Sequence, residues 1–206
     1  MSGETVIHVV EDDRPMRESL VELLQDAGYT VHAYGRAEEL LSRGDALEPG
    51  CIVSDVRMPG MDGLTLLRRL RIAGSVLPLI LITSHGDVSM AVAAMKLGAV
   101  DFLEKPFEAD TLLTAIDTAF GPRLSDTGAV DVEVARQTLQ KLTSRETEVF
   151  ECLVAGKSNK EIAVALGISP RTVEFHRAHI MEKTSSKGLP DLVRLWLAGN
   201  LPQTAK

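Results

Sequence analysis

The chain is poor in cysteine. Its 206 residues include only two, Cys51 and Cys152, which lie far apart in the sequence. This number and spacing exclude a disulfide-rich secreted scaffold and a cysteine-based zinc motif. Both residues stand in apolar stretches, so we expect both thiols to be buried and reduced.

Long apolar runs are also missing. The longest, residues 77–82, contains Pro78 and falls far short of the roughly 20 residues that span a bilayer. The N-terminus is polar, then strand-like, then acidic, so no secretory signal is visible. We therefore expect a cytoplasmic protein with no membrane partner.

The two ends of the chain differ in charge. Residues 1–120 contain 19 acidic and 10 basic side chains, whereas residues 121–206 contain 10 acidic and 12 basic ones. This asymmetry suggests two domains with different partners.

The first 120 residues alternate short apolar runs with amphipathic segments whose apolar residues recur at helical spacing. This alternation predicts a flavodoxin-like α/β domain, a five-stranded parallel sheet of order 2-1-3-4-5 with helices on both faces. The expected strands are Thr5–Val10, Tyr29–Tyr34, Cys51–Ser54, Leu79–Thr83 and Val100–Leu103.

After Phe120 the pattern changes. Residues 121–140 have linker composition, with a weak helical pattern at 130–139. From 141 to 206 only helical patterns follow, and they predict an all-α domain of four helices. Two capping boxes, Thr143 with Glu146 and Ser158 with Glu161, mark helix starts, and Ser169 before a proline marks a third.

Polar residues stand where the predicted strands end. Glu11 and Asp12 follow the first strand, Asp55 the third, Thr83 the fourth and Lys105 the fifth. Ends of like polarity share one edge of a parallel sheet, where open α/β folds bind ligands. Three carboxylates cannot stay ionised together without a counter-charge, and Mg²⁺ suits such oxygen ligands. An aspartate in such a place can attack a phosphoryl group.

These residues, with 55–60 (Asp-Val-Arg-Met-Pro-Gly) and 104–107 (Glu-Lys-Pro-Phe), make residues 1–120 resemble the receiver domain of bacterial response regulators. The resemblance implies that Asp55 accepts a phosphoryl group from a sensor histidine kinase. It implies Mg²⁺, with Mn²⁺ as a substitute, held by Asp12, Asp55 and the backbone carbonyl of Arg57 and organised by Glu11.

The same resemblance implies that Thr83 and Lys105 sense the phosphate, that Phe102 is the switching aromatic, and that the Lys105–Pro106 bond is cis. Arg57 and His85 border the expected path of the hydrolytic water. They either tune a slow autodephosphorylation or are plain exposed loop residues.

Residues 162–166 and 171–183, joined by a short turn, have the layout of a helix-turn-helix, whose second helix enters the major groove of DNA. Glu174 either accepts from a cytosine amino group or pairs with Arg171 or Arg177. His176 and His179 have helical spacing without further ligands, which favours surface or packing roles over metal binding. The candidate DNA-binding residues are Lys157, Lys160, Arg171, Thr172, Glu174, Phe175, Arg177 and Lys183.

Residues 142–149, 159–163 and 169–177 resemble the LuxR/NarL-type DNA-binding domain. Segments 84–92, 95–107 and 189–194 narrow the resemblance to FixJ-type regulators. It implies a transcriptional activator in which phosphorylation shifts Thr83 and Phe102, and the fourth helix, fifth strand and fifth helix then form a dimer face.

The expected partners are the kinase, double-stranded promoter DNA, a second copy of the chain and RNA polymerase. Whether the unphosphorylated receiver also masks the DNA-binding helices stays open. Rival interpretations are a phosphatase or hydrolase with Asp55 as nucleophile, and a module that binds protein through its helices. The first lacks the second acid of an Asp-x-Asp motif, since Arg57 occupies that position.

Overall fold

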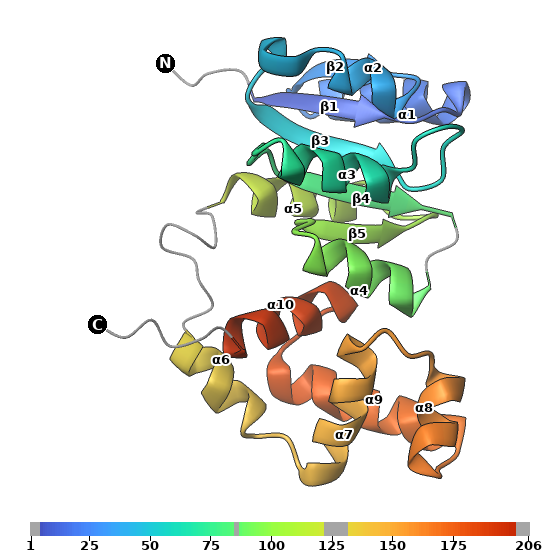
Figure 1. Ribbon diagram of the computed structural model, residues 1–206, viewed down its shortest axis with the longest axis vertical. Helices are drawn as coiled ribbons and strands as arrows, with labels where there is room; N and C mark the ends of the chain where they lie inside the picture. Colours follow the sequence, from blue (N-terminus) through green and yellow to red (C-terminus); the bar gives the residue numbers. More distant parts are fainter. Residues whose placement is uncertain (1–4, 85–86, 122–131, 201–206) are drawn as a thin grey trace. The chain divides into compact units, whose positions relative to one another are not determined.

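A computed structural model describes residues 5–84, 87–121 and 132–200 (Figure 1). By its internal contacts the chain divides into two compact units. Unit 1 comprises Met1–Gly86 and Leu97–Gly121, and unit 2 comprises Asp87–Lys96 and Pro122–Lys206.

Unit 1 contains a parallel sheet of five strands in the order β2-β1-β3-β4-β5, as the sequence predicts. β1 pairs with both β2 and β3, so β1 and β3 are direct neighbours at the centre of the sheet. The strands are β1 (Val6–Val10), β2 (Thr30–Tyr34), β3 (Gly50–Asp55), β4 (Leu79–Thr83) and β5 (Asp101–Glu104).

The central strands are mostly apolar and are covered on both faces. Every residue of β1, β3 and β4 is buried, which is the pattern expected of a parallel sheet between two helical layers. The helices of unit 1 are α1 (Arg14–Asp26), α2 (Ala37–Leu41), α3 (Gly63–Ile72) and α5 (Ala109–Phe120), with a 3-10 turn at Gly44–Ala46.

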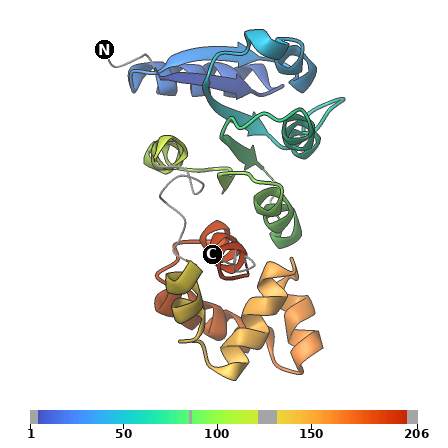
Figure 2. The same cartoon turned by 60° about the vertical axis from the view of Figure 1, so that its left-hand side comes forward.

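Two of these helices bury one face of the sheet. α1 and α5 pack on alternate residues of the strands, including Ile7, Val9 and Val53, while α2 and α3 lie on the other side. Figure 2 turns the sheet so that α3 and α5 are seen on opposite sides of it. The carboxyl edge between these layers is left open for the polar residues.

Unit 2 is helical. Both predicted capping boxes are present: Thr143 accepts from the backbone N–H of Glu146 and Ser158 from that of Glu161, and each glutamate bonds back. Ser169 caps the third predicted helix, with Pro170 as its first residue. The helices are α4 (Val88–Lys96), α6 (Val132–Leu139), α7 (Ser144–Val154), α8 (Asn159–Leu166), α9 (Pro170–Thr184) and α10 (Leu189–Gly199).

The segment expected to be a linker contains helix α6, whose Ala135 packs on Leu195 and Ala198 of α10. Both cysteines are free, but only Cys51 is buried; Cys152 is partly exposed, so the expectation of burial is wrong for it. Burial raises the pKa of the Cys51 thiol to about 12. Among the residues that the structure describes, no helix has the length and apolar character needed to cross a membrane.

Candidate phosphorylation site and DNA-binding surface

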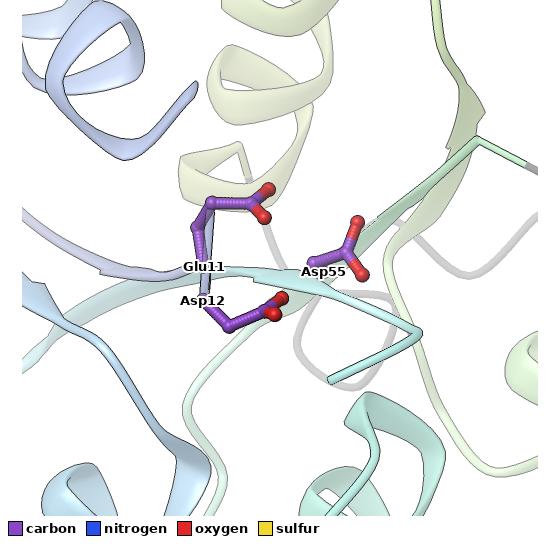
Figure 3. Close-up of side chains that lie close together, drawn as sticks. All are labelled: Glu11, Asp12 and Asp55. Atoms are coloured by element: carbon purple, nitrogen blue, oxygen red, sulfur yellow. The ribbon is translucent and has the colours of Figure 1, made fainter. Parts of the chain in front are cut away.

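Three carboxylates meet at the carboxyl edge of the sheet. β1 ends at Val10, so Glu11 and Asp12 follow directly, while Asp55 is the last residue of the neighbouring β3. One oxygen from each carboxylate lies within 4.8 Å of the others, and Figure 3 shows the three groups turned toward a common space. The structure thus brings together the acids that the sequence singled out.

Lys105, which follows β5, supplies a cation to this cluster. Its Nζ lies 2.6 Å from Oδ1 of Asp55 and 2.7 Å from Oε2 of Glu11. The three side chains are only 12%, 7% and 3% exposed, respectively. The Lys105–Pro106 peptide bond is cis, as the family resemblance implied.

Burial and ion pairing act against each other on these groups. Burial raises the pKa of Glu11, and the hydrogen bond from Lys105 offsets only part of that rise. Burial by itself would lower the pKa of Lys105, but its bonds to Asp55 and Glu11 outweigh that effect and the pKa is raised. The ammonium therefore stays charged and holds two carboxylates.

The cluster opens into a depression of about 650 Å³. On its rim Arg57 is exposed, and its backbone N–H donates to Oδ2 of Asp55 over 2.6 Å. A phosphoryl donor can reach the acids from solvent through this opening. Its lining consists of Glu11, Asp12, Asp13, Met16, Asp55, Arg57, Ser84, Lys105 and Pro106.

The donor set fits a divalent metal ion. Three carboxylate oxygens converge in a polar, open depression, and hard cations such as Mg²⁺ take oxygen ligands while keeping some of their waters. The residues that can hold such an ion are Glu11, Asp12 and Asp55.

The predicted switch residues are internal. Thr83 ends β4 and is fully buried, and its backbone carbonyl accepts from the N–H of Lys105 over 2.8 Å. Phe102 lies on β5 and is 9% exposed. His85, the other predicted neighbour of the phosphate, lies outside the described residues.

Sequence reasoning missed two residues that bind the loops around this site. Arg17 on α1 donates to the backbone carbonyls of Glu11 and Asp12. Glu38 on α2 accepts from the N–H of Met61 in the loop after Asp55. Neither residue stands at a strand end, and only the folded chain reveals that each reaches a functional loop.

In unit 2, α8 and α9 form the predicted helix-turn-helix. Gly167 ends α8 in the left-handed conformation at φ 65°, which suits glycine. Ser169 then caps α9 two residues later. Arg145 of α7 donates to the carbonyl of Leu166 at the end of α8 over 2.7 Å, which fixes the turn from a third helix.

The predicted DNA-binding residues fall into two groups. Lys157, Lys160, Arg171, Glu174 and Phe175 are exposed, and Thr172 is half-buried beside the cap of α9. Phe175 is 57% exposed.

Two predicted cations bind within the domain instead. Arg177 donates to the side chain of Asn159 on α8 over 2.6 Å, and burial lowers its pKa. Lys183 lies 2.7 Å from the buried carboxylate of Glu146. Nδ1 of His179 lies 3.9 Å from the same carboxylate, and its ring packs at a tilt against that of Phe175, with the centroids 4.1 Å apart. These contacts fit the packing interpretation rather than metal binding.

Comparison with known proteins identifies both domains. Residues 7–117 match the family model of the response regulator receiver domain, and residues 140–196 match that of bacterial regulatory proteins of the luxR family. The chain belongs to the two-component response regulators, with a receiver domain followed by a LuxR-type helix-turn-helix domain. It is a transcriptional regulator, not an enzyme in the usual sense.

Within this class the chain is of the FixJ type. It is 48% identical to the transcriptional regulatory protein FixJ of Azorhizobium caulinodans, covering 95% of this chain and 94% of that protein. It is 46% identical to FixJ of Rhizobium meliloti, covering 94% and 95%. The crystal structure of full-length FixJ from B. japonicum aligns with a TM-score of 0.55 at 46% identity, covering 96% of this chain and 98% of that one.

Proposed function

We propose that Asp55 is the phosphoryl acceptor of this regulator and that a sensor histidine kinase is the donor. The observation that carries the proposal is the geometry at Asp55, a buried carboxylate between Glu11, Asp12 and Lys105 at the mouth of an open depression. A carboxylate oxygen of Asp55 attacks the phosphorus of a phosphohistidine. The new P–O bond forms as the P–N bond breaks, and its electron pair returns to the imidazole, which takes up a proton.

The site is proposed to work with Mg²⁺, and Mn²⁺ substitutes for it. When bound, the ion neutralises charge on the phosphoryl oxygens. Asp12, Asp55 and the carbonyl of Arg57 are the proposed ligands, and Glu11 organises them. Lys105 already lies 2.6 Å from Asp55 and is placed to hold a phosphoryl oxygen.

Phosphorylation adds about −1.5 to −2 charges at the edge of the sheet. We propose that Thr83 and Phe102 respond together and repack α4, β5 and α5 into a dimer face. Such a response is a two-state equilibrium biased by one modification. The paired regulator then presents two helix-turn-helix units to a DNA site with two-fold symmetry.

The proposed DNA surface uses the exposed cations Lys157, Lys160 and Arg171 for phosphate contacts. Thr172, Glu174 and Phe175 are the proposed base-contacting residues. Arg177 and Lys183, which already bond to Asn159 and Glu146, contribute to DNA binding through their remaining donors.

We further propose that the receiver domain spans 1–120, the linker 121–140 and the DNA-binding domain 141–206. The protein acts in the cytoplasm, where it meets its kinase, promoter DNA and RNA polymerase, and it activates transcription. Arg57 and His85 tune the lifetime of the phosphate. An unchanged phospho-Asp55 half-life in both Arg57→Ala and His85→Ala would refute that role.

The test treats wild type and Asp55→Asn with acetyl phosphate and Mg²⁺ and measures the mass of each. The wild type is expected to gain one phosphoryl group and the variant none. A wild type that gains no mass overturns the proposal, and multiple turnover of added phosphate esters would favour the hydrolase instead. DNA affinity that falls steeply with salt supports the regulator over a protein-binding module, for which no such affinity is expected.

A further inference from the structure

Two of the three acids at the phosphorylation site lie in a loop of only three residues between β1 and α1. Glu11, Asp12 and Asp13 join the end of β1 to the start of α1. The side chain of Asp13 caps α1, and the backbone N–H of Glu11 donates to the carbonyl of Tyr34 over 3.1 Å. These bonds fix the ends of the loop, but they leave the carbonyls of Glu11 and Asp12 to be held by another group.

Arg17 holds both carbonyls. Its Nη1 donates to the carbonyl of Glu11 over 2.6 Å and to that of Asp12 over 3.2 Å. The side chain is half-buried and reaches back from the first turns of α1, whose own start is fixed by the bond from the Arg17 N–H to the carbonyl of Asp13. Charge-assisted hydrogen bonds of this kind are roughly twice as strong as neutral ones.

The orientation of these peptide groups determines where the acid side chains point. A backbone rotation at Glu11 or Asp12 would swing its carboxylate away from Asp55, with which it now converges. Arg17 resists that rotation because one rigid guanidinium bonds two successive carbonyls.

Arg17 also differs electrostatically from Lys105. The ammonium of Lys105 bonds carboxylate oxygens of Asp55 and Glu11 directly, so it competes with a metal ion for them. Arg17 instead bonds the backbone carbonyls of Glu11 and Asp12. Arg17 thus holds these two residues in place and leaves their carboxylate oxygens available to a metal ion.

We propose that Arg17 is a positioning residue of the phosphorylation site, which holds Glu11 and Asp12 in the geometry that binds a divalent metal ion. The inference rests on the proposed metal-assisted phosphorylation of Asp55. Partners that orient metal ligands from the outer shell typically change metal affinity by about 10- to 100-fold when removed.

The test measures Mg²⁺ and Mn²⁺ affinity of the full chain by calorimetry in wild type, Arg17→Met, Arg17→Lys and Arg14→Met. Arg14 is the matched control, since it lies on the same helix, its side chain is 78% exposed and it pairs with Glu18. Arg17→Met is expected to weaken metal binding by about tenfold or more, and Arg17→Lys to recover part of it, while Arg14→Met matches wild type. Circular dichroism in EDTA verifies that each variant is folded.

The kinetic readout uses acetyl phosphate at varied Mg²⁺. If Arg17 is a positioning residue, Arg17→Met should mainly raise the Mg²⁺ concentration that gives half-maximal phosphorylation. Its phosphorylation rate at saturating Mg²⁺ should fall by a smaller factor. A folded Arg17→Met whose metal affinity lies within twofold of wild type overturns the inference. If that variant does not fold, Arg17→Gln, which also lacks the positive charge and the reach of arginine, decides by the same criterion. If wild type itself binds no metal ion, the proposed metal site is wrong. That outcome is distinct from a failure of the inference about Arg17.

Discussion

At Asp55 the decisive feature is a balance of charge. Two buried carboxylates share one ammonium, and a third, exposed carboxylate lies close to them. The domain therefore carries an excess of negative charge at one point until a metal ion binds. Asp55 stays in place because Lys105 compensates part of this charge.

Replacing Lys105 tests this balance. In Lys105→Gln the free energy of unfolding without divalent ions should fall by on the order of 3 kcal/mol, the usual cost of leaving a buried charge without its partner. Mg²⁺ should restore more stability to the variant than to wild type, because it supplies the missing positive charge.

The measurement for Lys105→Gln is urea denaturation followed by tyrosine absorbance, since Tyr29 and Tyr34 both lie in unit 1. Exposed Arg14→Gln serves as the control and should change stability by less than about 0.5 kcal/mol. Equal losses for Lys105→Gln with and without Mg²⁺ would contradict the account.

His8 makes the receiver unit sensitive to acid. It is 1% exposed on β1, and its Nε2 donates to the carbonyl of Glu48 over 2.9 Å. Burial lowers its pKa below the usual 6.5; nearby His32 and Arg43 add to this, whereas the bond to the Glu48 carbonyl opposes it. The unfolded chain therefore binds this proton more readily than the folded one.

Stability from His8 is thus complete above about pH 6.5 and declines as the pH falls below it. His8→Gln keeps a donor for the Glu48 carbonyl but does not titrate. Its free energy of unfolding should fall less than that of wild type between pH 7 and pH 5, measured with the tyrosine signal. Identical pH profiles would exclude His8 as the source.

Several residues that meet at the site could be predicted from the sequence. Glu11, Asp12, Asp55 and Lys105 each follow or end a strand, and parallel topology alone brings such positions to one edge. The roles of Arg17 and Glu38 could not be predicted from the sequence. They depend on which backbone carbonyl or N–H a long side chain reaches in the folded chain.

At the scale of elements, the two capping boxes show what a local pattern leaves undetermined. Thr143 with Glu146 and Ser158 with Glu161 have the same spacing and form the same bonds. Glu146 is nevertheless buried and pairs with Lys183 from α9, whereas Glu161 is exposed. The sequence predicted both helix starts. It did not predict that the cap residue Glu146 of α7 also forms an ion pair with Lys183 of α9.

Substituting the two glutamates should separate these roles. Glu146→Gln should destabilise unit 2 by about 1.5–3 kcal/mol, since it removes the carboxylate that accepts a charge-assisted hydrogen bond from Lys183. Glu161→Gln keeps an exposed acceptor for the Ser158 N–H and should cost less. Trp196, the chain's one tryptophan, lies in α10 and reports unfolding of unit 2 by fluorescence. Similar losses for both variants would contradict a special role for the buried pair.

The same pair predicts a pH dependence. Hydrogen bonds from Lys183 and Thr143 lower the pKa of Glu146 to about 2 from its usual 4.5. Its contribution to stability is therefore present above pH 4.5 and lost as the pH falls toward about 2. In the same fluorescence assay, wild type should lose more stability over that pH range than Glu146→Gln. Equal losses would show that Glu146 is not the source of the pH dependence.

In the whole molecule, the difference in charge between the two parts of the sequence follows the two domains. The acidic excess lies in the part of the chain with the receiver domain, where we propose metal and phosphate chemistry at carboxylates. The basic excess lies in the part with the LuxR-type domain, which we propose binds DNA. Each helix-turn-helix offers few exposed cations, so binding by a single copy should be weak and a pair should bind much more tightly.

The central claim is that the phosphate on Asp55 controls DNA binding. The most direct measurement is the DNA dissociation constant of wild type and Asp55→Asn, each with and without acetyl phosphate and Mg²⁺, at one fixed salt concentration. We predict that phosphorylation tightens binding by wild type by about tenfold or more, in the range of typical allosteric coupling, and leaves Asp55→Asn unchanged. A wild type that carries the phosphoryl group but binds DNA no more tightly, or an Asp55→Asn variant that responds as wild type does, would contradict the account.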